Sequence, residues 1–254
     1  MNRQKGTKIN YLLKNWPLGT VAVYSWFNKN CADRKLVQQY LKSGWIERLG
    51  RGAFKRAGEN VDWMGAVYAM QQQMKKTVHP AGKTALQLLG LAHYVPANFK
   101  MGQVNLFGSE KETLPAWFKK HDWGVSINYI MSGLFREADK LGLTAYDAGG
   151  YEIKISSAER AALEFCYAVP EKESFVELDE IMSSLVTLRP GLVQELLVAC
   201  RSVKVKRLFM YLAEKHEHPW VKRIDIEKID FGKGKRALCK NGKYNPKYKL
   251  VVPK

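Results

Sequence analysis

The sequence predicts an α+β fold in two domains, a small one at residues 1–58 and a larger one at residues 59–254. Three helical patterns and then two short strand patterns fill the first 58 residues. Helical and strand-like segments are mixed along the rest of the chain, which is typical of an α+β domain. With 254 residues, 46% of them hydrophobic, the chain is long enough to bury a substantial core.

Two short helices are expected first. Residues 8–15, KINYLLKN, carry apolar side chains at helical spacing. This helix must end before Pro17, because proline disfavours helical backbone in the residue that precedes it. A second helix is predicted within residues 19–30, with Thr20 as its N-cap and Val23 on its apolar face.

A third helix is expected after Asp33, which can cap it. Its apolar residues Leu36, Val37, Tyr40 and Leu41 fall within an arc of about 140°, at about 100° per residue. The opposite arc holds cationic and amide side chains without an acid: Arg34, Lys35, Gln38, Gln39 and Lys42. Arg and Lys can pair with guanine edges or phosphates, and Gln can bind adenine through two hydrogen bonds. An ordinary solvated helix face could have the same composition, so the neighbouring elements matter.

A β-hairpin is predicted directly after this helix. The segments WIERL and AFKRA read as two strands, and Gly50-Arg51-Gly52 allows a tight connection between them. Three helices followed by a hairpin give the order of a winged helix-turn-helix. The wing would carry four cations to flanking phosphates or a minor groove: Arg48, Arg51, Lys55 and Arg56.

The net charge of +17 is concentrated at the two ends of the chain. Residues 1–60 hold 12 Lys/Arg against 3 Asp/Glu, residues 61–200 hold 13 against 16, and residues 201–254 hold 16 against 5. Such a distribution favours a polyanionic partner. A second polyanion-facing surface is hypothesised near the C-terminus from Lys204, Lys206, Arg207, Lys233, Lys235 and Arg236, with a solvated basic face as the alternative. The segment SVKVK could be strand or helix.

The larger domain shows weaker patterns. Helices are expected at residues 61–74, at 81–90 and in SSAERAALEFCYAVP, strands in GQVNLFGS and YEIKISS, and three further helices between Phe175 and Trp220. The triplet Gly82-Lys83-Thr84 is not a phosphate-binding loop, because Thr77 stands where the motif requires glycine and no buried strand precedes it. A helix N-terminus at Thr84 is predicted instead.

Catalytic and metal-binding patterns are weak. His216 and His218 have no nearby cysteine, and we interpret them as surface or capping residues. The acids Glu177, Asp179 and Glu180 are best explained as an exposed helix face. We therefore predict no catalytic residues, no metal site and no cofactor. Four scattered cysteines suggest neither a disulfide framework nor a zinc site: Cys31, Cys166, Cys200 and Cys239.

No apolar run approaches the ~18 residues of a membrane span, and the N-terminal segment lacks the features of a signal peptide. The sequence thus predicts a cytoplasmic protein that does not interact with membranes.

Seven phrases lie in order along nearly the whole chain: WPLGTVAVYSWFNKN, YLKSGWIERLGRGAFKRAG, HPAGKTALQLLGLAHYV, LPAWFKKHDWG, ISSAERAALEF, TLRPGLVQELLVACRSVKVKRLFMYLAEKHEHPW and GKGKRAL. Together they resemble the antitoxins and transcriptional regulators of AbiE-type, type IV toxin–antitoxin systems. The resemblance implies a non-enzymatic repressor that binds repeats in its own promoter DNA through the winged helix. It also implies that the larger domain counteracts a nucleotidyltransferase-type toxin, and that the two proteins need not form a stable complex.

Two alternatives remain open at this stage. A nucleic-acid-processing enzyme would use the winged helix to deliver a catalytic domain, and would require a tight acid cluster or a metal site there. An RNA-binding module would stack bases on Tyr244 and Tyr248 in the basic segment KNGKYNPKYKLVVPK. A simple strand pair with both tyrosines on one face is the competing interpretation of that segment.

Overall fold

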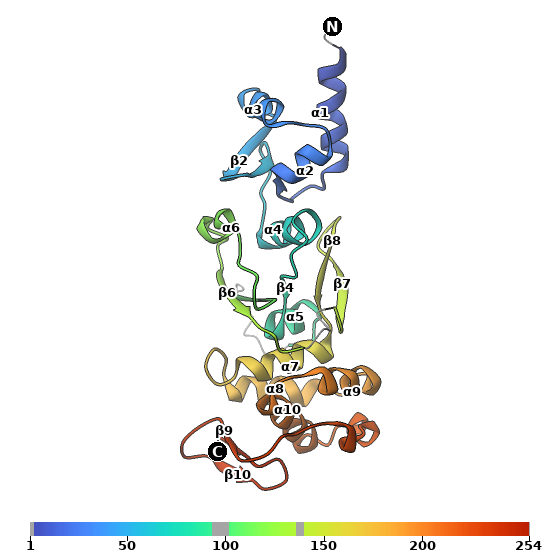
Figure 1. The fold of residues 1–254 in the computed structure, drawn as a ribbon, viewed down its shortest axis with the longest axis vertical. Helices are drawn as coiled ribbons and strands as arrows, with labels where there is room; N and C mark the ends of the chain where they lie inside the picture. The colour runs from blue at the N-terminus through green and yellow to red at the C-terminus, as the bar shows by residue number, and fades with distance from the viewer. Residues whose placement is uncertain (1–2, 93–101, 136–139, 254) are drawn as a thin grey trace. The chain divides into compact units, whose positions relative to one another are not determined.

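In the computed structural model, residues 3–92, 102–135 and 140–253 are described (Figure 1). The chain forms two compact units. Unit 1 consists of residues 1–79, 111–126 and 145–154, and unit 2 consists of residues 80–110, 127–144 and 155–254. Unit 1 therefore contains the whole segment 1–58 together with later parts of the chain.

A winged helix-turn-helix begins unit 1. Its elements are α1 (Arg3–Asn15), β1 (Ala22–Val23), α2 (Tyr24–Lys29), α3 (Arg34–Lys42), β2 (Ile46–Gly50) and β3 (Ala53–Arg56). The three strands form an antiparallel sheet in the order β1-β3-β2. The expected order of three helices and a hairpin is confirmed, with one additional strand.

Aromatic side chains hold this small core together. The ring of Phe27 lies edge-on to Trp16 and to Phe54, with centroids 5.6 Å apart in both pairs. The buried indole nitrogen of Trp16 donates to the carbonyl of Thr20, so its one polar atom is satisfied. Val37 from α3 and Leu12 from α1 complete the same cluster. The apolar faces of all three helices thus meet the wing strand β3.

The second helix begins later than the sequence predicts, at Tyr24. Val23 belongs to β1, where it pairs with Ala53 of β3. The hydroxyl of Thr20 donates to the carbonyl of Pro17 at 2.7 Å and does not cap the helix. A strand of two residues is too short to show the alternation of apolar and polar side chains that marks a strand. The apolar residues at this point therefore fitted a helical pattern equally well.

The rest of unit 1 packs around this module. It includes α4 (Trp63–Tyr68), the π-helical segment η1 (Ala69–Gln73), α6 (Ala116–Lys120) and parts of the paired strands β7 (Leu143–Asp147) and β8 (Glu152–Ser156). The side-chain amide of Gln73 accepts from the Val23 N–H at 2.9 Å and donates to the Val21 carbonyl at 2.8 Å. Gln73 therefore satisfies the outer edge of β1 in the way that a neighbouring strand would.

Unit 2 is built mainly from helices. Its helices are α5 (Gly82–Leu88), α7 (Ala158–Ala168), α8 (Phe175–Ser184), α9 (Pro190–Ala199), α10 (Val203–Lys215) and the short 3₁₀ segments η2 (Pro219–Arg223) and η3 (Ile226–Lys228). Two three-stranded sheets accompany them: β4 (His79–Pro80), β5 (Gln103–Gly108) and β6 (Ser126–Met131), and β9 (Arg236–Ala237), β10 (Lys243–Asn245) and β11 (Leu250–Val252). β4 and β6 each begin with a residue of unit 1.

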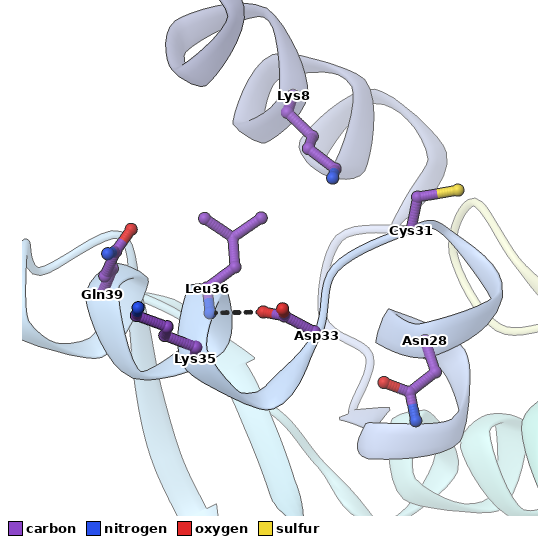
Figure 2. Close-up of a pocket in the computed structure, with 7 residues that line it drawn as sticks. All are labelled: Lys8, Asn28, Cys31, Asp33, Lys35, Leu36 and Gln39. Atoms are coloured by element: carbon purple, nitrogen blue, oxygen red, sulfur yellow. Dashed lines mark hydrogen bonds between the residues drawn. The ribbon is translucent and has the colours of Figure 1, made fainter.

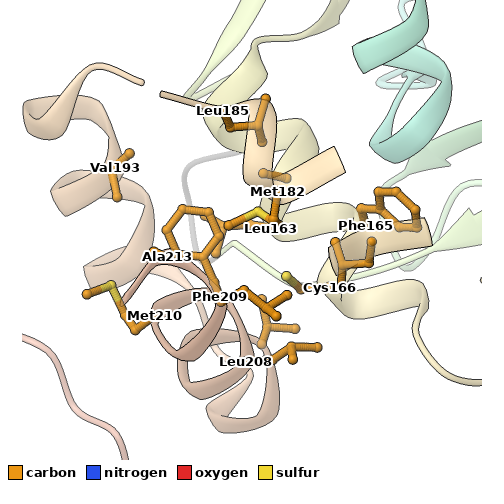
Figure 3. Packing of buried hydrophobic residues seen from close by; sticks show 14 of the residues in the cluster. Leu163, Phe165, Cys166, Met182, Leu185, Val193, Leu208, Phe209, Met210 and Ala213 are labelled. Atoms are coloured by element: carbon orange, nitrogen blue, oxygen red, sulfur yellow. The ribbon is translucent and has the colours of Figure 1, made fainter. Parts of the chain in front are cut away.

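The core of unit 2 lies between α7, α8, α9 and α10. Figure 3 shows Cys166 of α7, Met182 of α8 and Phe209 of α10 directed into this core. The three helices expected between Phe175 and Trp220 are confirmed as α8, α9 and α10, and η2 follows them. The thiols of the buried Cys166 and Cys200 have pKa values raised by burial, for Cys200 to about 11, and both are packing residues.

The Gly82-Lys83-Thr84 triplet begins α5, as the helical interpretation requires, although the helix starts at Gly82 and not at Thr84. A two-residue buried strand, β4, does precede it, contrary to expectation. The N–H of Gly82 donates to the buried carboxylate of Glu164 at 3.2 Å. The start of this helix is therefore occupied by an acid from the chain itself.

Candidate nucleic-acid interface

The exposed face of α3 carries the five side chains that the sequence singled out. Asp33 caps the helix, its carboxylate accepting from the Leu36 N–H at 2.8 Å. Val37 and Tyr40 are buried against the core and fix the rotation of the helix. The residues on the outer face are all exposed: Arg34, Lys35, Gln38, Gln39 and Lys42. We call these five residues the reading face.

Tyr24 of α2 orients two members of the reading face. Its hydroxyl accepts a hydrogen bond from Nε2 of Gln38 at 3.2 Å. The guanidinium of Arg34 lies 5.4 Å from the centroid of the same ring. The ring is in turn edge-on to Phe54 of the wing, with centroids 4.9 Å apart. One tyrosine thus connects α2, α3 and the wing.

A polar hollow of about 390 Å³ lies beside the reading face, between α1, the turn after α2, and the start of α3 (Figure 2). Lys8 projects towards it from α1, opposite Lys35 and Gln39 of α3. The other residues that line it are Asn28, Cys31, Asp33 and Leu36. The carboxylate of Asp33 is already engaged by the cap. Through this hollow, polar side chains of α1 and α2 lie next to the first turn of α3.

The wing tip presents two exposed arginines. The backbone of Gly52 has φ +80°, a conformation that favours glycine and closes the hairpin. Arg51 is exposed at the turn itself. Arg48 is exposed on β2, with its guanidinium 5.8 Å from the centroid of Phe54. Among the residues that the structure describes, neither side chain forms an ion pair with a carboxylate.

Lys55 and Arg56 have different surroundings, because both are engaged within unit 1. The ammonium of Lys55 lies 3.0 Å from the carboxylate of Glu47 and donates to the carbonyl of Glu59. The guanidinium of Arg56 donates to the carbonyls of Leu13 and Trp16 at the end of α1. A phosphate contact by either residue would require these bonds to break. We therefore interpret the pair as attaching the wing to its own domain.

Two lysines beside the wing were not anticipated from the sequence. Trp117 of α6 packs so closely on Gly50 of β2 that a Cβ added to the glycine would lie 2.7 Å from the Trp117 Cβ. Lys119 and Lys120 follow on α6 and are exposed. The phrase WFKKHDW contains adjacent lysines, but nothing in its pattern indicates contact with residues 1–58. The structure brings these cations to the wing through tertiary packing alone.

The expected C-terminal basic surface is not formed as proposed. The segment SVKVK is helical, and Lys206 and Arg207 are buried in α10, Arg207 with 2% of its surface exposed. Lys204 is half-buried and donates to the carbonyls of Tyr167 and Val169. Charged side chains usually face solvent, but Lys204 and Arg207 donate to backbone carbonyls and Lys206 is buried. The exposed members of the set are Lys233, Lys235 and Arg236.

The candidate metal and acid clusters are engaged in structural contacts. The imidazole of His216 lies 2.8 Å from the carboxylate of Asp179, and that of His218 lies 2.7 Å from the Met182 carbonyl. Glu177 pairs with Lys83. Within residues 3–92, 102–135 and 140–253, no three His, Cys, Asp or Glu side chains are grouped so that they could hold a metal ion. No helix in the same ranges is long and apolar enough to cross a membrane.

Comparisons with known proteins agree with this architecture. Residues 5–97 match a family model described as the N-terminal domain of the transcriptional regulator AbiEi antitoxin, and residues 101–253 match one described as the transcriptional regulator AbiEi antitoxin of type IV toxin–antitoxin systems. Among solved structures, the crystal structure of the RV2827C protein from Mycobacterium tuberculosis has a similar fold, with a TM-score of 0.61 and 14% sequence identity over 97% of this chain and 90% of that chain. No curated protein matches the chain significantly in sequence.

Proposed function

The chain belongs to the AbiEi family of transcriptional regulators and antitoxins of type IV toxin–antitoxin systems, and from that premise we propose that it is a cytoplasmic repressor of its own promoter. Residues 1–58 form the proposed DNA-binding domain. α3 would enter the major groove of duplex DNA, and the wing would contact the backbone alongside. Repeats in the promoter would each bind one copy of this domain.

The reading face is the observation that carries this proposal. It is a helix surface of three cations and two amides, with no acid, on a helix whose rotation is fixed by Val37 and Tyr40. Amides supply the hydrogen bonds that distinguish one base pair from another, and cations supply phosphate contacts. Because Tyr24 holds Gln38 and Arg34 before any DNA arrives, less side-chain freedom is lost on binding.

The remaining exposed cations near the wing support the backbone contacts of the same proposal. Arg48 and Arg51 lie on the hairpin, and Lys119 and Lys120 lie on α6 beside β2. Each phosphate contact adds affinity without sequence preference and makes binding more sensitive to salt. In this proposal α3 contacts the bases, and the wing and α6 contact the DNA backbone and so fix the position of α3 in the groove.

The antitoxin role is proposed for the larger domain, residues 59–254. Family membership supports a partner toxin, and we infer that it is of the nucleotidyltransferase class and is counteracted without a stable complex. The regulatory nature of the family favours a non-enzymatic protein over the nucleic-acid-processing enzyme. Metal-dependent cleavage of nucleic acid by the purified chain would support the enzyme instead.

Footprinting of the DNA upstream of its own coding sequence tests the repressor function. We expect the purified protein to protect repeated sites, with an affinity that falls as salt rises. The spacing of the sites would give the stoichiometry. Protection that is absent at low salt, or that covers unrelated DNA equally well, would overturn the proposal. The antitoxin role is tested separately, by asking whether the chain rescues growth when the toxin encoded beside it is expressed.

A further inference from the structure

The last part of the chain is strongly cationic yet folded. Residues 231–254 contain eight Lys or Arg and no Asp or Glu. They form the sheet β10-β11-β9, in which β10 and β11 are antiparallel and β9 is parallel to β11. A run of like charges with no acids repels itself and is usually found in disordered tails. Here the charges are held on a sheet, which needs a specific anchor.

Arg207 is that anchor. Its buried guanidinium donates to the carbonyls of Phe231, Gly232 and Gly234 at 2.9, 3.0 and 2.6 Å. It also lies 3.3 Å from the carbonyl of Lys249, just before β11. All of these acceptors are neutral backbone groups, so the positive charge of Arg207 is not cancelled by an acid. The arginine fixes the shape of the loop that leads into β9 and leaves the loop's own cations pointing outwards.

Three exposed lysines lie in the loops on either side of β9: Lys233, Lys235 and Lys240. Within the described residues, none of the three lies within 4.0 Å of a carboxylate oxygen, whereas Lys247 of the same segment pairs with Glu214. Arg236 and Lys243 are also exposed, but they alternate with Ala237 and Tyr244 and so lie on the other face of the sheet. Three cations around one short strand would be stabilised by an anionic partner with several charges.

An exposed aromatic ring lies among these cations. Tyr244 of β10 is 46% exposed. It is opposite Val251 of β11, which is opposite Ala237 of β9, so the three side chains lie on one face of the sheet. The ammonium of Lys235 lies 5.2 Å from the centroid of the Tyr244 ring. Tyr248, the other tyrosine of the segment, is buried and its hydroxyl donates to Glu214 at 2.6 Å, so it is not able to stack.

We propose that the face of the β10-β11-β9 sheet that carries Tyr244 binds single-stranded nucleic acid, with an unpaired base stacked on Tyr244 and the phosphates following Lys233, Lys235 and Lys240. Cations alone would suit duplex DNA equally well. An exposed ring among cations favours a single strand, because only unpaired bases offer a free face for stacking. This site is independent of promoter binding through α3, since it uses other residues in the other compact unit.

The test measures binding of the full-length protein to fluorescent 20-nucleotide poly(U) and poly(dT), and to the promoter duplex. We expect Tyr244→Leu to weaken binding to the single strands by about tenfold or more. Tyr244→Phe keeps the ring and should bind as the wild type does. Neither variant should change affinity for the promoter duplex. Tighter binding of poly(U) than of poly(dT) would identify RNA as the ligand. Equal binding would show that the site accepts single-stranded RNA and single-stranded DNA alike.

A charge variant completes the design. Lys233→Gln with Lys240→Gln should weaken single-strand binding and reduce its salt dependence. The matched control is Lys222→Gln with Arg223→Gln, which removes the same charge from exposed positions on η2. Equal effects of the two double variants, or an unchanged affinity in Tyr244→Leu, would overturn the proposal. Equal losses on promoter duplex and single strand in Tyr244→Leu would assign the sheet to duplex binding instead.

Discussion

The hydroxyl of Tyr24 accepts a hydrogen bond from Nε2 of Gln38, so a residue of α2 holds an amide that α3 presents to solvent. The distance of 3.2 Å is within the ordinary range of N–H···O hydrogen bonds. The same ring lies beside the guanidinium of Arg34. The reading face is thus oriented by a neighbour that does not itself belong to it.

Tyr24→Phe removes the hydroxyl but keeps the ring. We expect promoter affinity to fall by about 0.5–1.5 kcal/mol, the net contribution of one hydrogen bond. Tyr24→Leu should cost more, because it also removes the ring beside Arg34 and the edge-on contact with Phe54. Fluorescence titrations at a single salt concentration would measure both. Equal affinities of wild type and Tyr24→Phe would show that the bond does not orient Gln38 for binding.

Direct reading of bases predicts a different pattern for the amides of α3. Gln38→Ala or Gln39→Ala should weaken promoter binding by ~1–3 kcal/mol and leave binding to unrelated DNA almost unchanged. We expect one of the two to matter more than the other. Gln72→Ala, at an exposed position on η1, is the control. If both α3 variants bind the promoter with wild-type affinity, α3 is not the helix that reads the sequence.

Two arginines of the hairpin are expected to have different roles, Arg51 in DNA binding and Arg56 in the stability of the fold. Arg51→Ala is expected to weaken binding to all DNA sequences and to reduce the slope of log affinity against log salt by about one. Arg56→Ala should instead lower the free energy of unfolding by about 1.5–3 kcal/mol, because it removes charged hydrogen bonds to the end of α1. Salt titrations and urea unfolding of both variants would test this assignment. A stable Arg56→Ala variant with a reduced salt slope would return Arg56 to the DNA interface.

The parts of this interface that the sequence predicts are those fixed by local rules. Asp33 caps the expected helix, and the glycines at 50 and 52 form the expected hairpin, because caps and turns depend on neighbouring residues. Arg207 was misjudged, since its burial depends on carbonyls more than 20 residues further along the chain. The position of α6 beside the wing likewise depends on packing between distant parts of the chain, such as that of Trp117 on Gly50.

The lysines of α6 give a prediction of their own. Lys119→Ala with Lys120→Ala should weaken binding to promoter and unrelated DNA alike. The salt slope should fall by up to about two, because each lysine that binds a phosphate contributes about one to it. Lys222→Ala with Arg223→Ala provides a control with the same change in net charge at exposed positions of unit 2. Identical slopes for the two double variants would remove α6 from the interface.

His218 provides a measurable pH dependence in unit 2. It is 3% exposed, and its ring is stacked on Trp220 with centroids 5.3 Å apart. Nε2 lies 2.7 Å from the carbonyl of Met182. Burial lowers the pKa of His218 below its usual 6.5, although the bond to the Met182 carbonyl acts in the opposite direction and His216 nearby adds to the lowering. The side chain is therefore neutral in the folded protein at neutral pH.

A lowered pKa in the folded state means that the unfolded chain takes up the proton first as pH falls. The contribution of His218 to stability is thus fully present above pH ~6.5 and is lost as pH falls from there through the folded-state pKa, with a slope of at most about 1.4 kcal/mol per pH unit. His218→Gln retains an N–H donor for the Met182 carbonyl but does not titrate. Between pH 7.5 and 5.5, urea unfolding should therefore show a steeper loss of stability in the wild type than in His218→Gln. His216→Gln serves as the comparison, because it removes the neighbouring imidazole, which pairs with Asp179, and leaves His218 in place. Parallel stability curves for wild type and His218→Gln would show that His218 takes up its proton as readily in the folded protein as in the unfolded chain.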